Sequence, residues 1–218
     1  MNYSTSFAGT ENPISEGANW RNGLADGLDW HDVRTASAAA RPTTGTSGVS
    51  DSIACLTGSW GPDQTVQGTA LVSGADLNDE LELHVRCTIT ANTITSYECD
   101  FEVAGAISII RWNGASGDFT VIQGQVSLGR AIVTGDILGV RIVGGVITAS
   151  FNGVDIVSIA DSTFTNGSPG MGFDLGGADV GSGINFTGLT AFSATDGLTG
   201  VAARISDELS RRKFGRNI

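Results

Sequence analysis

Two neighbouring segments, residues 81–90 and 94–103, alternate apolar and polar side chains, and this alternation constrains the fold more than any other feature. In "LELHVRCTIT" every second residue from Leu81 to Ile89 is apolar. In "ITSYECDFEV" the polar positions include Glu98, Asp100 and Glu102. Successive side chains of a strand point to opposite faces. Each segment therefore predicts a strand with one polar and one apolar face, and places Tyr97, Cys99, Phe101 and Val103 in the core.

The rest of the chain repeats the strand signal in short runs between turn residues. "GDILGVRIVGGVITASFNGVDIVSIA" predicts three strands joined by a Gly-Gly turn and an Asn152-Gly153 turn, and Asn-Gly is a strong two-residue hairpin signal. Glycine is abundant, at 31 residues, which suits a fold rich in tight turns. We expect an all-β domain over residues 1–196, with about eleven to thirteen strands in a two-sheet antiparallel sandwich. The first fifty residues predict loops with at most one short strand.

A hairpin centred near Thr93 sets the expected pairing of the two alternating segments. The expected cross-strand pairs are Cys87 with Cys99, Arg86 with Asp100, His84 with Glu102, and Thr88 with Glu98. Opposite charges facing each other across strands stabilise a sheet by about 0.2–1 kcal/mol per pair. In this register the acids face cations and need no substrate.

The cysteines predict thiols rather than a disulfide framework. The chain has three, Cys55, Cys87 and Cys99, an odd and sparse set. We expect Cys87 and Cys99 to be buried opposite each other and reduced, because a buried free cysteine behaves as a small hydrophobe.

The order and spacing of several stretches resemble a known family. These stretches are "NPISEGANW", "WGPDQTVQGTALV", "SYECDFEVAGAISIIRWNG" and the hairpin region from Gly135 to Phe173. They follow the order seen in concanavalin A-like jelly-roll domains of the laminin-G-like kind, over roughly residues 5–196. Such domains are common in bacterial surface proteins and in bacteriophage virions. The resemblance implies a jelly-roll sandwich, and a fold by itself does not give a function.

The same resemblance implies an enzymatic alternative. Laminarinase- and lichenase-type glycoside hydrolases share the fold and carry E-x-D-x-E on one strand, which Glu98-Cys99-Asp100-Phe101-Glu102 matches. Carried over, Glu98 would be the nucleophile, Asp100 its helper and Glu102 the general acid/base. The aromatic flanks usual in these hydrolases are absent here, where Ser96 and Ala104-Gly105 stand instead. We therefore predict that the three acids form a solvent-facing polar surface without catalytic function.

The polar face also offers a glycan-binding hypothesis. Sugar recognition needs an aromatic plate and a few fixed hydrogen-bonding groups. Trp112 lies either at the rim or in the core, whereas Trp20, Trp30 and Trp60 are predicted to be packing residues. The candidate glycan-binding residues are His84, Arg86, Glu98, Asp100, Glu102, Arg111, Trp112 and Arg141.

The net charge and the absence of known motifs reduce the number of partners and cofactors that we expect. The net charge is −11, which argues against nucleic acid because phosphate binding needs clustered Lys and Arg. No apolar run is long enough to span a bilayer, and the first residues show no signal peptide. Asp26, Asp29 and Asp32 are spaced by three but do not form a calcium motif. The two histidines lack a zinc spacing, so we expect no cofactor, with calcium left open as an alternative that no motif supports.

Residues 197–218 form a distinct tail. They carry five basic and two acidic residues, a net charge of +3, which leaves −14 for the rest of the chain. Apolar residues at helical spacing and basic residues near the end predict an amphipathic helix over about residues 200–214. We expect this tail to be an assembly element that docks on another copy or another virion protein. The residues assigned to assembly are Val201, Ile205, Leu209, Arg211 and Arg212.

The sequence thus favours a non-enzymatic component of a bacteriophage virion. Within a virion the alternatives are a tail-fibre or baseplate adhesin and a capsid decoration or head-fibre protein. Its expected partners are other virion proteins, its own copies and glycans of the host surface. The rival interpretations are the glycoside hydrolase described above and a bacterial carbohydrate-binding module.

Overall fold

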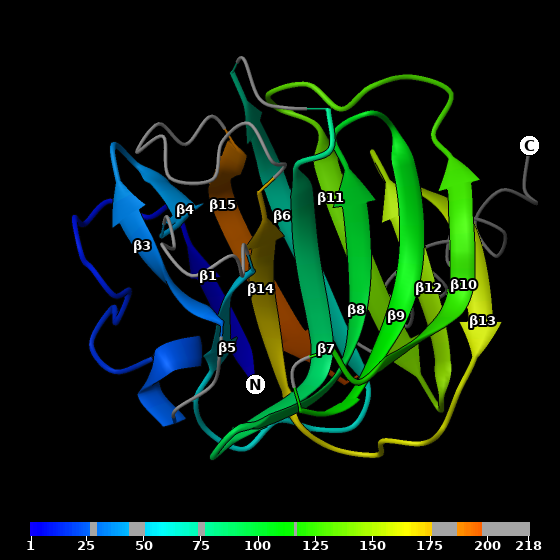
Figure 1. The fold of residues 1–218 in the computed structure, drawn as a ribbon, viewed down its shortest axis with the longest axis horizontal. Coiled ribbons are helices and arrows are strands. Elements are labelled where there is room, and N and C mark those ends of the chain that lie inside the picture. The colour runs from blue at the N-terminus through cyan, green and yellow to red at the C-terminus, as the bar shows by residue number, and fades with distance from the viewer. Residues whose placement is uncertain (27–29, 44–50, 74–76, 116, 176–186, 198–218) are drawn as a thin grey trace, which may run out of the picture.

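The computed structural model describes residues 1–26, 30–43, 51–73, 77–115, 117–175 and 187–197. These residues form two largely antiparallel sheets packed face to face, seen as a front and a back layer in Figure 1, and the strands within residues 31–42 join the two layers at one edge into a continuous hydrogen-bonded path. The front sheet runs in the order β10 (Phe119–Ser127), β9 (Ala106–Gly114), β8 (Thr93–Glu102), β7 (Glu80–Thr90), β14 (Ser168–Asp174), β5 (Ser52–Leu56), β2 (Trp20–Asn22). The back sheet runs in the order β4 (Ala39–Pro42), β15 (Thr187–Asp196), β6 (Gln64–Val72), β11 (Ile137–Val143), β12 (Val146–Phe151), β13 (Val154–Ala160).

The N-terminal fifty residues contain more regular structure than the sequence suggested. Strand β1 (Asn2–Thr5) pairs with β15, and β3 (His31–Ala36) pairs with β4 and, in parallel, with the start of β5. The short 3₁₀ helix η1 (Gly23–Asp26) lies between β2 and β3. The expectation of loops with at most one strand was therefore wrong, because these strands are only three to six residues long and leave little periodicity to detect.

The core lies between the two sheets, as the alternation predicted. Tyr97, Cys99 and Phe101 are fully buried, and Val103 is 2% exposed. Tyr97, Cys99 and Phe101 belong to one cluster with apolar residues of the back sheet such as Val140 and Ile147. Burial of side chains of this size contributes roughly 1.5–3 kcal/mol each. This confirms the two-sheet sandwich and the four predicted core positions.

The predicted Asn152-Gly153 turn is present. It joins β12 to β13 as a two-residue loop between Phe151 and Val154, and both turn residues have positive φ, 49° and 79°. Asn152 also donates its side-chain amide to Asp136. The hairpin geometry therefore follows from the local sequence.

The predicted register of the β7–β8 hairpin was wrong. The turn falls at residues 91–92, and β7 is irregular between Val85 and Thr88. Arg86, at this irregularity, has a φ of 51°. The observed cross-strand pairs are Glu82 with Asp100, His84 with Glu98, Glu80 with Glu102, Leu83 with Cys99, and Thr88 with Thr95. The turn at residues 91–92 displaces the pairing by three residues from the expected register, and the bulge displaces it by one more beyond Arg86. Arg86 therefore does not face Asp100.

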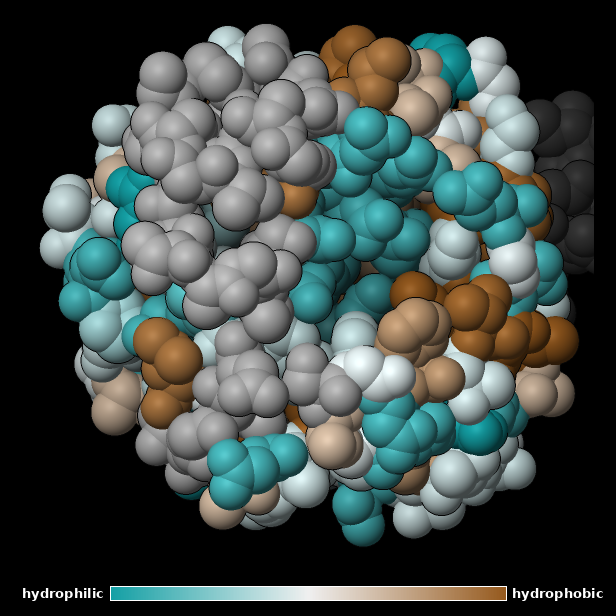
Figure 2. Space-filling model, in the orientation of Figure 1, coloured by the Kyte–Doolittle hydropathy of each residue, from teal (hydrophilic) through white to brown (hydrophobic). Residues whose placement is uncertain are grey.

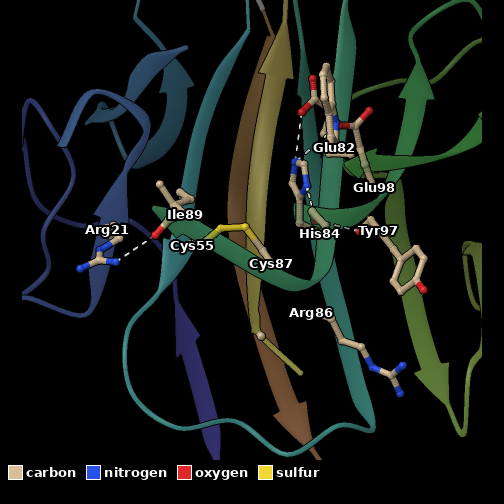
Figure 3. Close-up of a disulfide and its surroundings, with 12 residues drawn as sticks. Arg21, Cys55, Glu82, His84, Arg86, Cys87, Ile89, Tyr97 and Glu98 are labelled. Carbon is tan, nitrogen blue, oxygen red and sulfur yellow. Dashed lines mark hydrogen bonds and ion pairs between the residues drawn. A yellow bond between two sulfur atoms is a disulfide. The ribbon is translucent and has the colours of Figure 1, made fainter. Parts of the chain in front are cut away.

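The same bulge moves the side chain of Cys87 from the core face to the outer face of the front sheet. Beyond it, Cys87 and Ile89 belong to an apolar cluster on the outer face of the front sheet instead of the inter-sheet core. There Cys87 forms a disulfide with Cys55 of β5, 32 residues away (Figure 3). The prediction of a reduced Cys87 opposite Cys99 was therefore wrong, while Cys99 is a buried free thiol as expected.

The predicted tail helix lies outside the described residues. The structure describes the chain up to Gly197, so the helix expected over 200–214 and its assembly residues stay a prediction. Within the described ranges no helix has the length and apolar character needed to cross a membrane.

Candidate functional site

The outer face of the front sheet, which points away from the core, gathers acidic side chains from two adjacent strands. Even-numbered residues of β8, and of β7 before its bulge, point to this face, and their odd-numbered neighbours point to the core. Figure 2 shows hydrophilic residues grouped over this part of the sheet with hydrophobic residues beside them. The acids of this group are Glu80, Glu82, Glu98, Asp100 and Glu102.

At the centre of the group, His84 lies against two glutamates (Figure 3). Its Nε2 is 3.2 Å from Oε2 of Glu82 and 3.9 Å from Oε2 of Glu98. One ligand atom from each of the three residues lies within 4.8 Å of the others. All three side chains are buried, His84 to 1% and both glutamates to 4% exposure. We call these three residues the Glu–His–Glu cluster.

Hydrogen bonds fix the orientation of the cluster. Nδ1 of His84 is 3.0 Å from Oγ of Ser96, and that hydroxyl donates to the carbonyl oxygen of Tyr97. In the tautomer that carries its proton on Nδ1, His84 donates to Ser96, and the Nε2 lone pair is then directed at the glutamates. The indole Nε1–H of Trp112 donates to Glu98 at 2.6 Å.

Burial sets the charge state of the cluster. It lowers the pKa of His84 to about 3, so the imidazole is neutral near pH 7. Burial, and then the charge of Glu98, raise the pKa of Glu82 well above its usual range. Burial and the charge of Asp100 raise that of Glu98, although the Trp112 hydrogen bond opposes the shift. Adjacent carboxylates in a low dielectric cannot all remain ionised without a counter-charge.

The acids beyond the cluster continue toward the end of the strands. Burial and the charge of Glu102 raise the pKa of Asp100 to about 7, and burial and Asp100 raise that of Glu80 to about 9. Asp100 is only 6% exposed. Glu102 is half-buried and accepts a hydrogen bond from Gln125. The three predicted acids thus share one face, but the expectation that Glu98 and Asp100 face solvent was wrong.

An apolar group flanks the cluster and explains part of its burial. The rings of Trp30 and Trp112 contact each other edge to face at 4.7 Å. Trp30 donates its indole N–H to Asp51, whose pKa burial raises to about 7. Besides these two tryptophans the group contains Ile53, Cys55, Cys87, Ile89 and Ile94.

The three arginines proposed as glycan ligands do not lie beside the Glu–His–Glu cluster. Arg86 points away from His84 (Figure 3), and its guanidinium donates to the carbonyl oxygens of Pro62 and Phe164. Arg111 pairs with Asp161 at 2.5 Å. Arg141, on the back sheet, pairs with Asp155 at 2.6 Å. The structure therefore brings together only His84, Glu98, Asp100, Glu102 and Trp112 of the predicted set.

A separate cleft of about 480 Å³ opens beside the disulfide. Trp60, a half-buried residue that packs on the core, lies at its edge, and the Cys55–Cys87 disulfide lies in its wall. Arg21 also lines the cleft and donates to the carbonyl oxygen of Ile89 (Figure 3). The polar residues that line it are Arg21, Thr57, Ser59, Thr88, Asn166 and Ser168.

Sequence reasoning missed several residues of this region. Glu82 was treated as a polar strand position, although its place two residues before His84 puts both on one face. Trp30 and Asp51 come from distant segments, and only the fold brings them to this face. Trp60 was assigned to packing, which is true of the part that contacts the core.

Comparisons with known proteins show which solved structures share the fold of this chain. Neither family models nor curated protein sequences give a match. Among solved structures, the chain is similar to the carbohydrate-binding module CBM66 of Bacillus subtilis, with TM-score 0.57 and 12% identity over 84% of this chain and 96% of that one. The Bacillus licheniformis β-glucanase gives TM-score 0.55 and 12% identity over 90% and 98%. The CBM2 module of the evolved Dit of Lactobacillus casei BL23 phage J-1 gives 0.52 and 12% over 88% and 93%.

These similar structures include binding modules and an enzyme, so they establish the architecture and leave open the choice between binding and catalysis. At such low identity the likeness concerns the fold alone. Together with the sheet order described above, it assigns the chain to the concanavalin A-like jelly-roll fold.

Proposed function

We propose that this chain is a non-catalytic carbohydrate-binding domain carried on a bacteriophage particle. The observation that carries the proposal is the cleft beside the disulfide, which combines Trp60 with several polar side chains. Its volume of about 480 Å³ falls in the range of ligand sites, roughly 300–1,000 Å³. An aromatic ring that stacks on a sugar and polar groups that bind its hydroxyls are the usual means of glycan recognition.

The surroundings of Glu98 support a binding rather than a hydrolytic role. A retaining hydrolase needs a nucleophilic carboxylate that reaches the anomeric carbon, about 5–5.5 Å from the acid/base. Glu98 is 4% exposed and is occupied by Trp112 and His84. The cavity beside it measures about 10 Å³, which is too small for a sugar ring. Glu98 and Asp100 are also too buried to serve as glycan ligands.

Two observations support the proposal that this protein is part of a phage particle and acts outside a cell. One of the similar structures is a module of a phage protein. The Cys55–Cys87 disulfide suits an oxidising environment, since cytosolic thiols are kept reduced. The neighbours of the gene provide a direct test, because tail or capsid genes on both sides support a virion role and their absence argues against it.

Glycan binding is tested with the full-length protein on a glycan array, followed by calorimetry with the best ligand. Trp60→Ala is expected to weaken binding at least about tenfold, because it removes the stacking surface. Trp60→Phe keeps an aromatic ring and should retain most of the affinity. Phe119→Ala is the matched control, because Phe119 is an exposed aromatic residue of β10 outside the cleft.

Two results would contradict the proposal. If no glycan binds, or if Trp60→Ala and Phe119→Ala weaken binding equally, the cleft is not the site. If the protein releases reducing sugar from laminarin, lichenan or agarose and Glu98→Gln abolishes this activity, the chain is a hydrolase.

The assembly role of the tail is a separate part of the proposal. It rests on the sequence alone, a +3 segment joined to a −14 body. Deletion of residues 199–218 is expected to lower the mass in solution, or to prevent incorporation into particles. A truncated protein that assembles normally would show that the tail is dispensable.

A further inference from the structure

We propose that Glu82, His84 and Glu98 bind a zinc ion on the outer face of the front sheet, with a water molecule as the fourth ligand. The donor set is one imidazole nitrogen and two carboxylates. Zinc sites with three protein ligands and one water use such N and O donors. This proposal does not depend on glycan binding in the cleft.

The first argument is the meeting of three hydrogen-bond acceptors. Ser96 lies 3.0 Å from Nδ1 of His84, and in the tautomer that donates this Nδ1–H to Ser96, Nε2 presents a lone pair to Oε2 of Glu82 at 3.2 Å. Glu98 presents a second carboxylate on the same side, 3.9 Å from Nε2. Two acceptors at hydrogen-bond distance need a proton or a cation between them. A metal ion satisfies all three at once.

The distances suit a small tetrahedral ion. Zinc–ligand bonds of 2.0–2.2 Å place neighbouring ligand atoms about 3.3–3.6 Å apart. The two Nε2–carboxylate distances, 3.2 and 3.9 Å, lie on either side of that value. Calcium, by contrast, takes six to eight oxygen ligands, and an imidazole nitrogen favours a transition metal.

The surroundings resemble those of other metal centres. A ligating histidine normally donates its second N–H to a neighbouring group, and Ser96 is placed to accept such a bond from Nδ1 of His84 at 3.0 Å. Ligating carboxylates are in turn hydrogen-bonded, as Glu98 is to Trp112. A cavity of about 10 Å³, lined by Trp30, Asp51 and the Glu–His–Glu cluster, adjoins the ligand atoms. That is room for about one water molecule.

A second observation points to a missing cation. Oδ1 of Asp100 is buried without a hydrogen-bond partner, and Asp100 lies directly opposite Glu82 on the same face. Among the described residues, His84 is the sole ion-pair partner of Glu82 and Glu98. A buried, unpaired carboxylate is costly. A divalent ion in the cluster would offset the charge of its two ligands and reduce the field on Asp100.

The test uses the full-length, tag-free protein, stripped with a chelator and re-dialysed. Competition with a chromophoric zinc chelator and elemental analysis should give one zinc per chain. Cobalt, substituted for zinc, should give the intense visible absorption of a tetrahedral site. Zinc should also raise the unfolding temperature, because it binds the native state.

Variants distinguish this site from others on the chain. Glu82→Gln, Glu98→Gln and His84→Gln should each weaken zinc binding more than about 100-fold, since loss of a second-shell partner alone costs 10–100-fold. Ser96→Ala, which removes such a partner, should fall in that 10–100-fold range. Glu102→Gln is the control, an acid of the same strand and face outside the ligand set, and should bind zinc as the wild type does.

The unfolding temperatures of the metal-free proteins show whether a variant loses zinc because a ligand is missing or because its fold is destabilised. Glu82→Gln replaces a buried carboxyl group by a neutral amide of the same size, so the metal-free variant should unfold at the same temperature as the wild type or higher, yet lose the zinc-induced rise. The proposal is overturned if the stripped wild type takes up no zinc, or if the three ligand variants bind zinc as Glu102→Gln does.

Discussion

Gly172 lies directly opposite Glu82 in the β14–β7 ladder, and a Cβ atom on Gly172 would lie 2.1 Å from Oε2 of Glu82. The same Cβ atom would lie 2.9 Å from Nε2 of His84. The side chains of the Glu–His–Glu cluster thus lean over β14, and a residue without a side chain gives them the space. This contact makes β14 part of the site, although it contributes no ligand atom.

Gly172→Ala should therefore displace the Glu82 carboxylate. We expect a loss of about 1–3 kcal/mol in the free energy of unfolding, typical of an overpacked site, and a weaker affinity for zinc. Urea denaturation and zinc competition measure the two effects. Gly124→Ala in β10 is the control, because no atom lies within 4 Å of a Cβ built there.

A double variant identifies the source of the strain. In a Glu82→Ala background the closest contact, with the Glu82 carboxylate, is gone and only that with His84 remains, so Gly172→Ala should cost at least about 0.5 kcal/mol less than in the wild type. Equal costs in the two backgrounds would mean that Gly172 is needed for another reason.

The Cys55–Cys87 disulfide should stabilise the fold. The two residues are 32 apart in sequence, and the loop-closure entropy of such a link contributes about 3–4 kcal/mol. Reduction should lower the urea midpoint accordingly, and a Cys55→Ala, Cys87→Ala double variant should not respond to reductant. Alkylation of the unfolded, unreduced protein should label Cys99 alone. Labelling of all three cysteines would show that the disulfide is absent and that the cysteines are free thiols, as the sequence suggested.

Asp136 should make the protein sensitive to acid. Two hydrogen bonds from Arg130, at 2.6 and 2.7 Å, and others from Asn152 and Val133 bring its pKa to about 2. The folded state thus holds this proton less tightly than the unfolded state does. Its contribution is present above about pH 4 and is lost as the pH falls toward 2.

The acid sensitivity is checked with Asp136→Asn. The variant should lose about 1.5–3 kcal/mol at pH 7, the range for hydrogen bonds to a charged group, and the difference from wild type should shrink below pH 4. Asp155→Asn, which removes an exposed ion pair, is the control. A difference that stays constant from pH 7 to pH 2 would exclude ionisation as the cause.

Part of the structure follows from local sequence. The apolar residues from Tyr97 to Val103 are buried because strand alternation assigns them to one face, and the Asn152-Gly153 turn forms because both positions accept positive φ. Both depend on neighbours along the chain. Such features can be predicted without knowledge of the fold.

The geometry of the site depends on tertiary contacts that cannot be read from the local sequence. The irregularity at Arg86 shifts the β7–β8 register and moves Cys87 to the outer face, where it meets Cys55. Nothing in "HVRCT" signals this bulge. Glu98 is buried because Trp112 and Trp30, from separate segments, pack beside it. Alternation identified the face that holds the acids, and tertiary packing decided that this face is not solvated.

The two arginines Arg86 and Arg141, which the sequence grouped together as glycan ligands, should behave very differently. Arg86 is 3% exposed and binds the carbonyl oxygens of Pro62 and Phe164 at 2.8 and 2.6 Å. Arg86→Ala leaves these oxygens without their donor and should cost about 1.5–3 kcal/mol. Arg141 forms an exposed ion pair with Asp155, and such pairs contribute about 0–1 kcal/mol.

Urea denaturation of Arg86→Ala and Arg141→Ala tests this contrast, with the affinity for the array-selected glycan as a second measurement. Arg141→Ala should leave both quantities nearly unchanged, because its side chain lies on the back sheet, away from the cleft. Arg86→Lys should recover only part of the stability, since an ammonium lacks the forked geometry that reaches two carbonyl oxygens. Equal destabilisation by both alanine variants, or weaker glycan binding in Arg141→Ala, would contradict the placement of these side chains.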